Sequence, residues 1–167
     1  MVTSQNELLQ KLKDLEVSFR HFTHPAVFST ADIVLLPEKI PGVDTKNLFL
    51  RDEKRTRYLL VCVRAETRVH LKELGRALGI KGITFASPEE MLELLGITPG
   101  SVCLFSLLND TGGKVAGYID AAIDPESEMQ NHPLENTATV VLKVSDLERF
   151  CNNFSHPLTR IEIPVRV

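Results

Sequence analysis

Residues 46–64 carry the pattern that most restricts what this chain can fold into. Two strand-like runs, at 46–51 and 58–64, flank the charged stretch at 52–55. Runs of this length, rich in β-branched and aromatic residues and joined by polar turn residues, are typical of an antiparallel hairpin. Helix-like segments follow the hairpin, so a purely helical fold is excluded and a sheet with packed helices is expected.

Helices are expected wherever a capping residue adjoins apolar residues at helical spacing. These segments are 5–16 after the Ser4 and Glu7 capping box, 69–78 before Gly79, 88–96 after Ser87, and 145–152 from Ser145. A further short helix is expected after residues 29–30 and before Pro37. Pro at the start of a helix and Gly just past its end fit the known asymmetry of helix termini.

Five further strands are expected from alternating or continuous apolar runs bounded by turn residues. They are 17–23, 102–107, 115–119, 139–144 and 161–165, with a tight loop at 98–101 and a hairpin turn at 109–113. The fold class is therefore α+β, or mixed α/β: a single domain over residues 1–167 with one curled mixed sheet and packed helices. No G-x-G-x-x-G links a first strand to a helix, which disfavours a Rossmann unit.

Composition excludes several classes. The 167 residues are 43% hydrophobic and 25% charged, the balance of a globular domain, and no apolar run approaches the ~20 residues of a membrane span. The first residues lack the pattern of a secretory signal. Three cysteines without C-x-x-C spacing predict neither a disulfide framework nor a zinc knuckle. A cytoplasmic location is expected.

Basic charge is concentrated in one segment. Residues 46–81 contain ten basic and four acidic groups, a net charge of +6, whereas the whole chain has a net charge of −3. One basic face on an acidic body suits an anionic partner held at a single place. Composition alone fits a solvated surface equally well.

No residue has the spacing of a metal ligand set or a covalent nucleophile. His21 and His24 form H-x-x-H, but residues three apart on a strand face opposite sides, and no carboxylate accompanies them at ligand spacing. Gly-x-Ser-x-Gly is missing, and the cysteines lie in apolar segments. The sequence therefore predicts neither a metal nor a cofactor.

Three motifs that follow one another along the chain are informative about function: TKNLFLRD at 45–52, TPGSV at 98–102 and HPLENTAT at 132–139. With HPAVF at 24–28 and LLND at 107–110, they make the chain resemble the YbaK/prolyl-tRNA synthetase-associated editing domain family from about residue 5 to 165. The resemblance is greatest to the free-standing PrdX-like branch, which deacylates alanyl-tRNA(Pro).

The resemblance implies a hydrolase of the ester that joins a wrong amino acid to proline tRNA. It implies a catalytic role for Lys46 and His132, with the aminoacyl pocket formed by loop 100–104. Implied substrate-binding residues are Asn47, Gly100, Ser101, Val102, Leu104, Asn136 and Thr137. Many relatives have Pro where this chain has Leu104, which bears on the amino acid preferred. Arg51, Arg55 and Arg57 of the basic segment are predicted to contact the tRNA. The expected partners are aminoacylated proline tRNA and, as a further candidate, prolyl-tRNA synthetase.

Hydrolysis needs no covalent nucleophile, because an aminoacyl ester is already reactive. Backbone N–H groups at 100–102 would hold the oxyanion, and Lys46 would fix a phosphate or the terminal adenosine. His132 has no adjacent Asp or Glu to orient it, so it is expected to shape the pocket rather than relay protons. Two alternatives stay open: the same chemistry on cysteinyl, seryl or threonyl esters, and a non-catalytic nucleic-acid-binding module.

Overall fold

The structure is a computed structural model that describes residues 2–27 and 39–167. The helix expected after residues 29–30 lies outside these ranges. The helices are α1 (Gln5–Asp14), α3 (Leu71–Leu78), α4 (Pro88–Leu95), α5 (Val144–Asn153) and the 3-10 helix η1 (Leu104–Asn109). The strands are β1 (Arg20–Thr23), β2 (Thr45–Arg51), β3 (Tyr58–Arg64), β4 (Thr84–Phe85), β5 (Val115–Asp120), β6 (Glu128–Asn131), β7 (Ala138–Lys143) and β8 (Leu158–Ile161). No helix in the described ranges is long and apolar enough to cross a membrane.

The predicted starts of α1 and α4 and the predicted ends of α3 and α4 are confirmed, whereas α1 ends at Asp14 rather than near residue 16 and α3 begins at Leu71 rather than at residue 69. The Ser4 hydroxyl accepts a hydrogen bond from the Glu7 N–H at 3.2 Å, and the Glu7 carboxylate accepts one from the Ser4 N–H at 2.7 Å. Ser87 and Glu90 repeat this capping box at α4. Gly79 ends α3 with a φ of 65°, a left-handed conformation that glycine adopts without steric cost.

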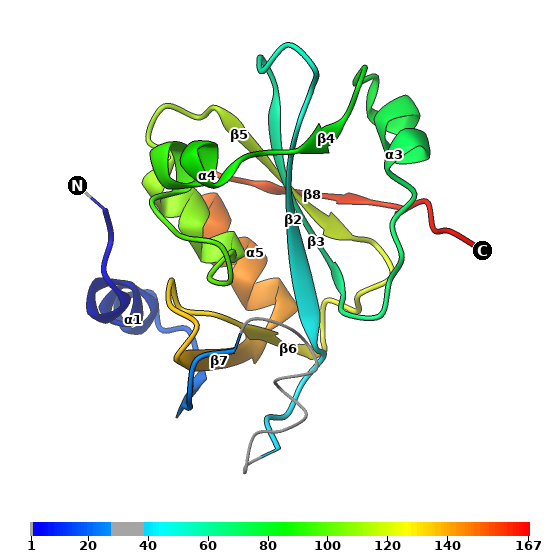
Figure 1. The fold of residues 1–167 in the computed structure, drawn as a ribbon. Helices are drawn as coiled ribbons and strands as arrows, with labels where there is room; N and C mark the ends of the chain where they lie inside the picture. The colour runs from blue at the N-terminus through cyan, green and yellow to red at the C-terminus, as the bar shows by residue number, and fades with distance from the viewer. Residues whose placement is uncertain (1, 28–38) are drawn as a thin grey trace.

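The strands divide between two sheets rather than the one curled sheet that was expected. One has the order β1-β7-β6 and the other β4-β2-β3-β5-β8 (Figure 1). The hairpin is confirmed, since β2 and β3 are antiparallel with Leu48 opposite Val61. The predicted α+β class is also confirmed.

Residues 102–107 are not a strand. Leu104 begins η1, and Phe105, Ser106 and Leu107 are buried in the same 3-10 helix. A short apolar run does not reveal its own period, and this one is surrounded by core on all sides. The turn at 109–113 forms around the Asp110 carboxylate, but the strand that follows it does not complete a hairpin. Instead β5 runs parallel to both β3 and β8.

Three smaller predictions were also wrong. Helix α5 begins at Val144 with Lys143 as its N-cap and no side-chain cap, so Ser145 is not the capping residue. Strand β8 ends at Ile161, and Val165 forms only an isolated bridge with Val69. Strand β6 lies in a segment expected to be an acidic and polar loop; its pairing with β7 supplies the order that its composition does not.

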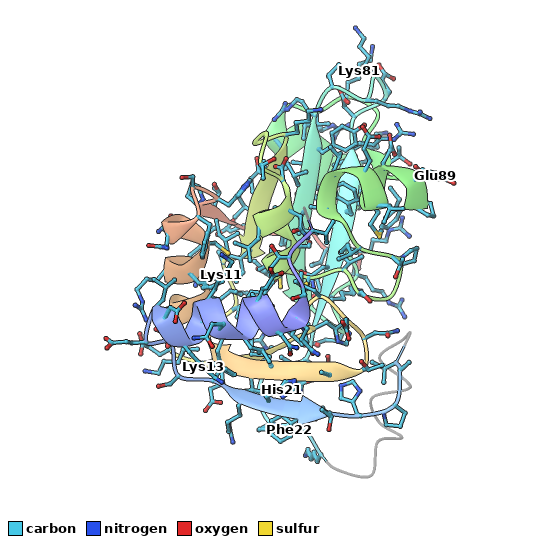
Figure 2. The ribbon with its side chains drawn as sticks, turned by 90° about the vertical axis from the view of Figure 1, so that its left-hand side faces the viewer. Lys11, Lys13, His21, Phe22, Lys81 and Glu89 are labelled. Atoms are coloured by element: carbon cyan, nitrogen blue, oxygen red, sulfur yellow. The ribbon has the colours of Figure 1, made fainter. Side chains whose placement is uncertain are left out.

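Alternation along β2 separates two hydrophobic cores. Phe49 faces the larger core, where η1, α4 and α5 pack together with Leu8 and Leu12 of α1. Leu50 faces the smaller core, which is closed by Leu74 of α3. Figure 2 shows α1 lying along the three-stranded sheet, with His21 and Phe22 of β1 at the opposite end of the molecule from Lys81.

All three cysteines are free and buried, in agreement with the expected lack of disulfides. Burial raises the pKa of the Cys62 and Cys151 thiols to about 12 and that of the Cys103 thiol to about 11. The thiols therefore stay protonated near neutral pH, where only a thiolate would be nucleophilic.

Candidate functional site

The start of β2 is the point where the predicted motifs meet. The Thr45 hydroxyl donates to the Gln130 carbonyl of β6 at 2.9 Å. The Asn47 amide donates to the Val102 carbonyl at 3.3 Å. The first and second motifs are thus in direct contact, and β6 brings the third motif, which begins at His132, to the same end of the strand.

The loop before η1 presents backbone N–H groups at this end of β2. Gly100 has a φ of 92°, which turns the chain where a side chain would be strained. The Ser101 N–H donates to the Thr98 carbonyl at 3.1 Å, so it is not available to an oxyanion. In the described ranges the N–H groups of Gly100 and Val102 have no such acceptor. Of the three N–H groups expected to contact the oxyanion, only those of Gly100 and Val102 are therefore available.

The loop at 132–137 packs directly against the loop at 100–103. The Leu134 N–H is hydrogen-bonded to the Cys103 sulfur, and Leu134 is buried in the larger core. Leu134 has a φ of 71°, an uncommon conformation for a residue with a branched side chain. Core packing and the sulfur contact together hold the loop in this shape.

His132 is half-buried and held in one orientation. Its Nδ1 lies 3.1 Å from the Ala138 carbonyl oxygen, so Nδ1 carries the proton and Nε2 is the atom left to accept one. Burial lowers the pKa of His132 below its usual value; the Ala138 hydrogen bond opposes this shift and the nearby His24 adds to it. The sequence offered no adjacent Asp or Glu to orient His132, and in the structure a backbone carbonyl orients it.

The His24 and His132 rings are neighbours in a T-shaped arrangement, with their centroids 6.5 Å apart. Its Nδ1 lies 2.8 Å from the Pro25 carbonyl and its Nε2 lies 2.8 Å from the Thr139 hydroxyl. His21 is exposed on β1, so the two imidazoles of the H-x-x-H pattern do not converge. Among residues 2–27 and 39–167, no cluster of three or more His, Cys, Asp or Glu side chains could hold a metal ion.

Lys46 lies on the opposite face of β2 from Asn47, as strand alternation requires. Its cross-strand partner is Val63, which is fully buried in the smaller core, whereas Asn47 pairs with Cys62 of the larger core. No ion pair within the described part of the chain involves Lys46. The two adjacent residues therefore serve different surfaces, and a role for Lys46 at the substrate remains a prediction.

Three predicted substrate-binding residues have structural contacts. The Asn136 side chain donates to the Val27 carbonyl at 3.1 Å, and the Asn136 carbonyl accepts from the Val27 N–H at 3.2 Å. Thr137 is exposed and its carbonyl accepts from the His24 N–H at 2.9 Å. Leu104 is fully buried in the larger core. These residues support the loop, and any contact they make with substrate remains a prediction.

The three predicted tRNA-binding arginines lie at or beyond the far end of β2: Arg51 is its last residue, about 17 Å along the strand from Lys46, and Arg55 and Arg57 follow in the turn before β3. Arg51 is paired with the buried Glu90, Nε to Oε2 3.2 Å, and its side chain is only 15% exposed. Arg55 is 65% exposed and lies 3.7 Å from Glu90 Oε1. Arg57 is exposed and donates to the last carbonyls of α3. Only Arg55 and Arg57 present open surface to a partner.

Sequence reasoning missed two groups in this site. His24 was considered only as a metal ligand, although the match at 24–28 already placed it within the resemblance. The Ala138 carbonyl carries no side-chain signal, so no sequence pattern could have identified it. Both are needed to account for the orientation and burial of His132.

Fold and sequence together place the protein in the class of aminoacyl-tRNA hydrolases. The chain belongs to the aminoacyl-tRNA editing domain family, because the sequence model of that domain matches residues 24–150. The predicted family is thereby confirmed.

Individual relatives cover nearly the whole chain. It is 34% identical to the prolyl-tRNA synthetase associated domain-containing protein 1 of Danio rerio, over 93% of this chain and 85% of that protein. It is 29% identical to the prolyl-tRNA editing protein ProX of Acetoanaerobium sticklandii, over 96% and 98% of the two chains. A solved structure described as a candidate trans-editing enzyme for prolyl-tRNA synthetase shares the fold, with a TM-score of 0.68 at 19% identity and coverage of 99% and 100%.

Proposed function

We propose that residues 1–167 act as one trans-acting deacylase that hydrolyses the ester of mischarged proline tRNA, with alanyl-tRNA(Pro) as the preferred substrate. The observation that carries this proposal is that Asn47 binds the loop of Gly100 and Val102, and Thr45 binds the strand that leads into His132, at one end of β2. The Gly100 and Val102 N–H groups have no acceptor in the described ranges, and His132 Nε2 is left to accept. An acceptor and two donors on opposing loops are what hydrolysis of a reactive ester requires. The similarity to a protein named for prolyl-tRNA editing supports the choice of tRNA.

In the proposed reaction a water oxygen attacks the ester carbonyl carbon. The N–H groups of Gly100 and Val102 stabilise the developing oxyanion, and His132 Nε2 accepts a hydrogen bond from the water or from the substrate. The bond between the carbonyl carbon and the ribose oxygen breaks, and the ribose oxygen takes a proton from the attacking water. The products are the free amino acid and uncharged tRNA. Lys46 holds a phosphate or ester oxygen at the rim as a point charge.

The preference for alanine follows from the limits of the synthetase. A pocket built for proline rejects alanine weakly, since each missing methylene is worth only about 1–3 kcal/mol. A second pocket that admits alanine and excludes proline by size corrects the error.

A second candidate is seryl-tRNA, or another ester whose side chain carries a donor. Two buried amide oxygens near this end of β2, Asn47 Oδ1 and Asn131 Oδ1, have no donor in the described ranges. A buried acceptor without a partner costs about 1–3 kcal/mol, and a hydroxyl that reached it would recover part of that cost.

A deacylation panel tests both candidates. Proline tRNA charged in turn with alanine, serine, cysteine and proline is incubated with the enzyme, and loss of ester is followed over time. We expect the fastest release for alanine and none for proline. Fastest release of serine would favour the second candidate, whereas binding without hydrolysis of any ester would leave only a nucleic-acid-binding module.

The proposed partner is aminoacylated proline tRNA, with prolyl-tRNA synthetase as a further candidate. Such a substrate is met in the cytoplasm, which is the proposed location, and the three free cysteines suit a reducing compartment. Cell fractionation with an antibody against the chain would test the location.

A further inference from the structure

Phe85 is an aromatic side chain that the fold leaves outside both cores. It is 55% exposed, although its chain neighbours Ile83 and Ala86 pack against the cores. It lies on β4, the edge strand of the five-stranded sheet. A single exposed apolar side chain is ordinary on a protein surface, but an exposed aromatic ring also offers a flat face on which a nucleic-acid base can stack.

Phe85 shares a face of the sheet with Lys46. It is the cross-strand partner of Leu50, and directly opposed residues on antiparallel strands point to the same side. Leu50, Leu48 and Lys46 alternate onto that side, so Lys46 lies about 13 Å along the strand from the Phe85 pair. The acidic α4 packs on the other face, since its Leu94 and Leu95 belong to the larger core.

A basic groove continues from Phe85 in the other direction. It has a volume of ≈ 600 Å³ and is lined by Ile83, two residues before Phe85, together with the loop at 79–82 and one side of α3. Its charged lining residues are Lys72, Arg76 and Lys81, and no acidic residue lines it. Arg76 is paired with Glu73 at 2.8 Å, and both partners are exposed. Figure 2 shows Lys81 at the tip of the molecule.

Phe85 and this groove form a path toward the tip of the molecule, since Ile83 lines the groove and, two residues before Phe85, lies on the same side of the extended chain. We propose that Phe85 is a stacking platform for an unpaired base near the 3′ end of the tRNA, while phosphates further along the RNA lie in the groove of Lys72, Arg76 and Lys81. This inference rests on the proposed function. A base has an apolar face for Phe85, and the groove is complementary in charge to the phosphates.

The chain contains no tryptophan, which allows a direct test in the full-length protein. Phe85→Trp introduces the single tryptophan of the chain at the proposed platform, and its fluorescence can be excited apart from that of the two tyrosines. Leu92→Trp is the matched control, because Leu92 is 58% exposed on α4, away from the path. An RNA hairpin with a single-stranded 3′ tail should quench the fluorescence of Phe85→Trp and leave that of Leu92→Trp unchanged. The same hairpin with a blunt end should quench neither.

Kinetics give a second readout. Phe85→Ala should raise KM for a mischarged hairpin with the tail by roughly 5- to 100-fold, the range expected for loss of one stacked base, with little change in kcat. Leu92→Ala should alter neither. Both variants should unfold at nearly the wild-type temperature, because both side chains are exposed.

Each outcome decides one proposal. Absence of quenching by the tailed hairpin, or equal quenching by the blunt one, overturns the stacking inference whether or not the enzyme is active. Quenching of both Trp variants alike would also overturn it and would point to a different docking surface. A wild-type enzyme that hydrolyses no mischarged tRNA overturns the proposed function, and the fluorescence titration still reads the stacking site.

Discussion

The two ends of β2 are built on opposite principles. At its start, Asn47 keeps a buried oxygen without a donor in the described ranges, and His132 Nε2 is left to accept. At its end, Arg51 and the neighbouring Tyr58 both bind Glu90, whose carboxylate also caps α4 through the Ser87 N–H. One end retains spare hydrogen-bonding capacity, and the other has used its capacity within the protein.

We expect this difference to separate residues that stabilise the fold from residues that contact the substrate. An unsatisfied buried polar atom is a cost that a fold without other demands would remove. A charge that is already paired and covered, as in Arg51, gives little to a partner. Substitutions at the start of β2 should therefore change catalysis, and those around Glu90 should change stability.

The largest expected effect is at Lys46. Lys46→Ala should lower the deacylation rate by roughly 30- to 1,000-fold, the loss of a positioning contact worth about 2–4 kcal/mol in the transition state. Its unfolding temperature should stay near the wild-type value, because Lys46 is only half-buried and makes no ion pair in the described ranges. Lys46→Arg should restore only part of the rate, because its planar guanidinium directs its donors differently. Wild-type turnover by folded Lys46→Ala would contradict the proposed role of this lysine.

Glu90→Ala should give the largest loss of stability. Removal of this carboxylate leaves the nearly buried Arg51 unpaired and should lower the free energy of unfolding by about 3 kcal/mol. Thermal denaturation should detect a fall of roughly 6–12 °C. Glu73→Ala, which breaks only the exposed pair with Arg76, should cost less than ~1 kcal/mol. Equal losses for the two variants would remove the distinction between the ends of β2.

The Glu90 contacts also predict a pH dependence of stability. Burial opposes ionisation of Glu90, but hydrogen bonds from Ser87 and Tyr58 and the charge of Arg51 lower its pKa below the usual value. The stabilisation is therefore complete above about pH 4.5 and is lost as the pH falls through the lower pKa of the folded state. The free energies of unfolding of the wild type and Glu90→Gln, measured in denaturant, should converge once the pH falls below the pKa of Glu90 in the folded state.

His132→Ala should change specificity at least as much as rate. We expect the ratio of alanine to serine released to shift by about tenfold, since the proposal puts His132 at the pocket and its side chain is larger than that of alanine. The lowered pKa keeps the imidazole neutral above its usual titration range, so the rate should be flat from about pH 7 to 8 in both proteins. An acid limb present in the wild type and lost in the variant would instead assign general base catalysis.

A smaller effect is expected at the exposed arginines. Arg55→Glu and Arg57→Glu should weaken tRNA binding by a few-fold at about 50 mM salt and hardly at about 0.5 M. Arg149→Glu on α5 is the control, since Arg149 is also exposed and lies outside the basic segment. Equal weakening at both salt concentrations would exclude the arginines from the tRNA footprint.

No effect is expected from chelation. Exhaustive dialysis against EDTA should leave the deacylation rate unchanged, because the proposed reaction uses backbone donors and an imidazole. A loss of activity that zinc restores would contradict this mechanism.

The sequence was most informative where a local rule acts alone. The Ser4 and Ser87 capping boxes and the hairpin of β2 and β3 depend on neighbouring residues, and each was predicted correctly. Residues 102–107 failed because continuous burial hides the difference between a strand and a 3-10 helix. The parallel pairing of β5 with β3 and β8 depends on distant residues, so the turn at 109–113 could not reveal it.

The candidate site divides in the same way. The order of the motifs suggested that the segments of Asn47, Gly100 and His132 belong to one site, and the structure brings these segments to one end of β2. The order of the motifs could not show that Lys46 faces away from Asn47. It also could not show that the Ser101 N–H is bonded to the Thr98 carbonyl, or that Arg51 is paired with Glu90. These contacts depend on side-chain direction and on tertiary pairing, and neither the order of motifs nor a count of charges reveals them.

The three buried thiols should resist oxidation when the cell is under oxidative stress. Peroxides and alkylating agents attack the thiolate, and with a pKa of about 11 only about one Cys103 side chain in ten thousand is ionised at pH 7. Reagents in solution must also wait for the core to open before they reach sulfur. Editing should therefore continue while exposed catalytic cysteines elsewhere in the cell are inactivated. The rate at which a thiol-reactive dye labels Cys103 then measures how often the loop that carries the site opens.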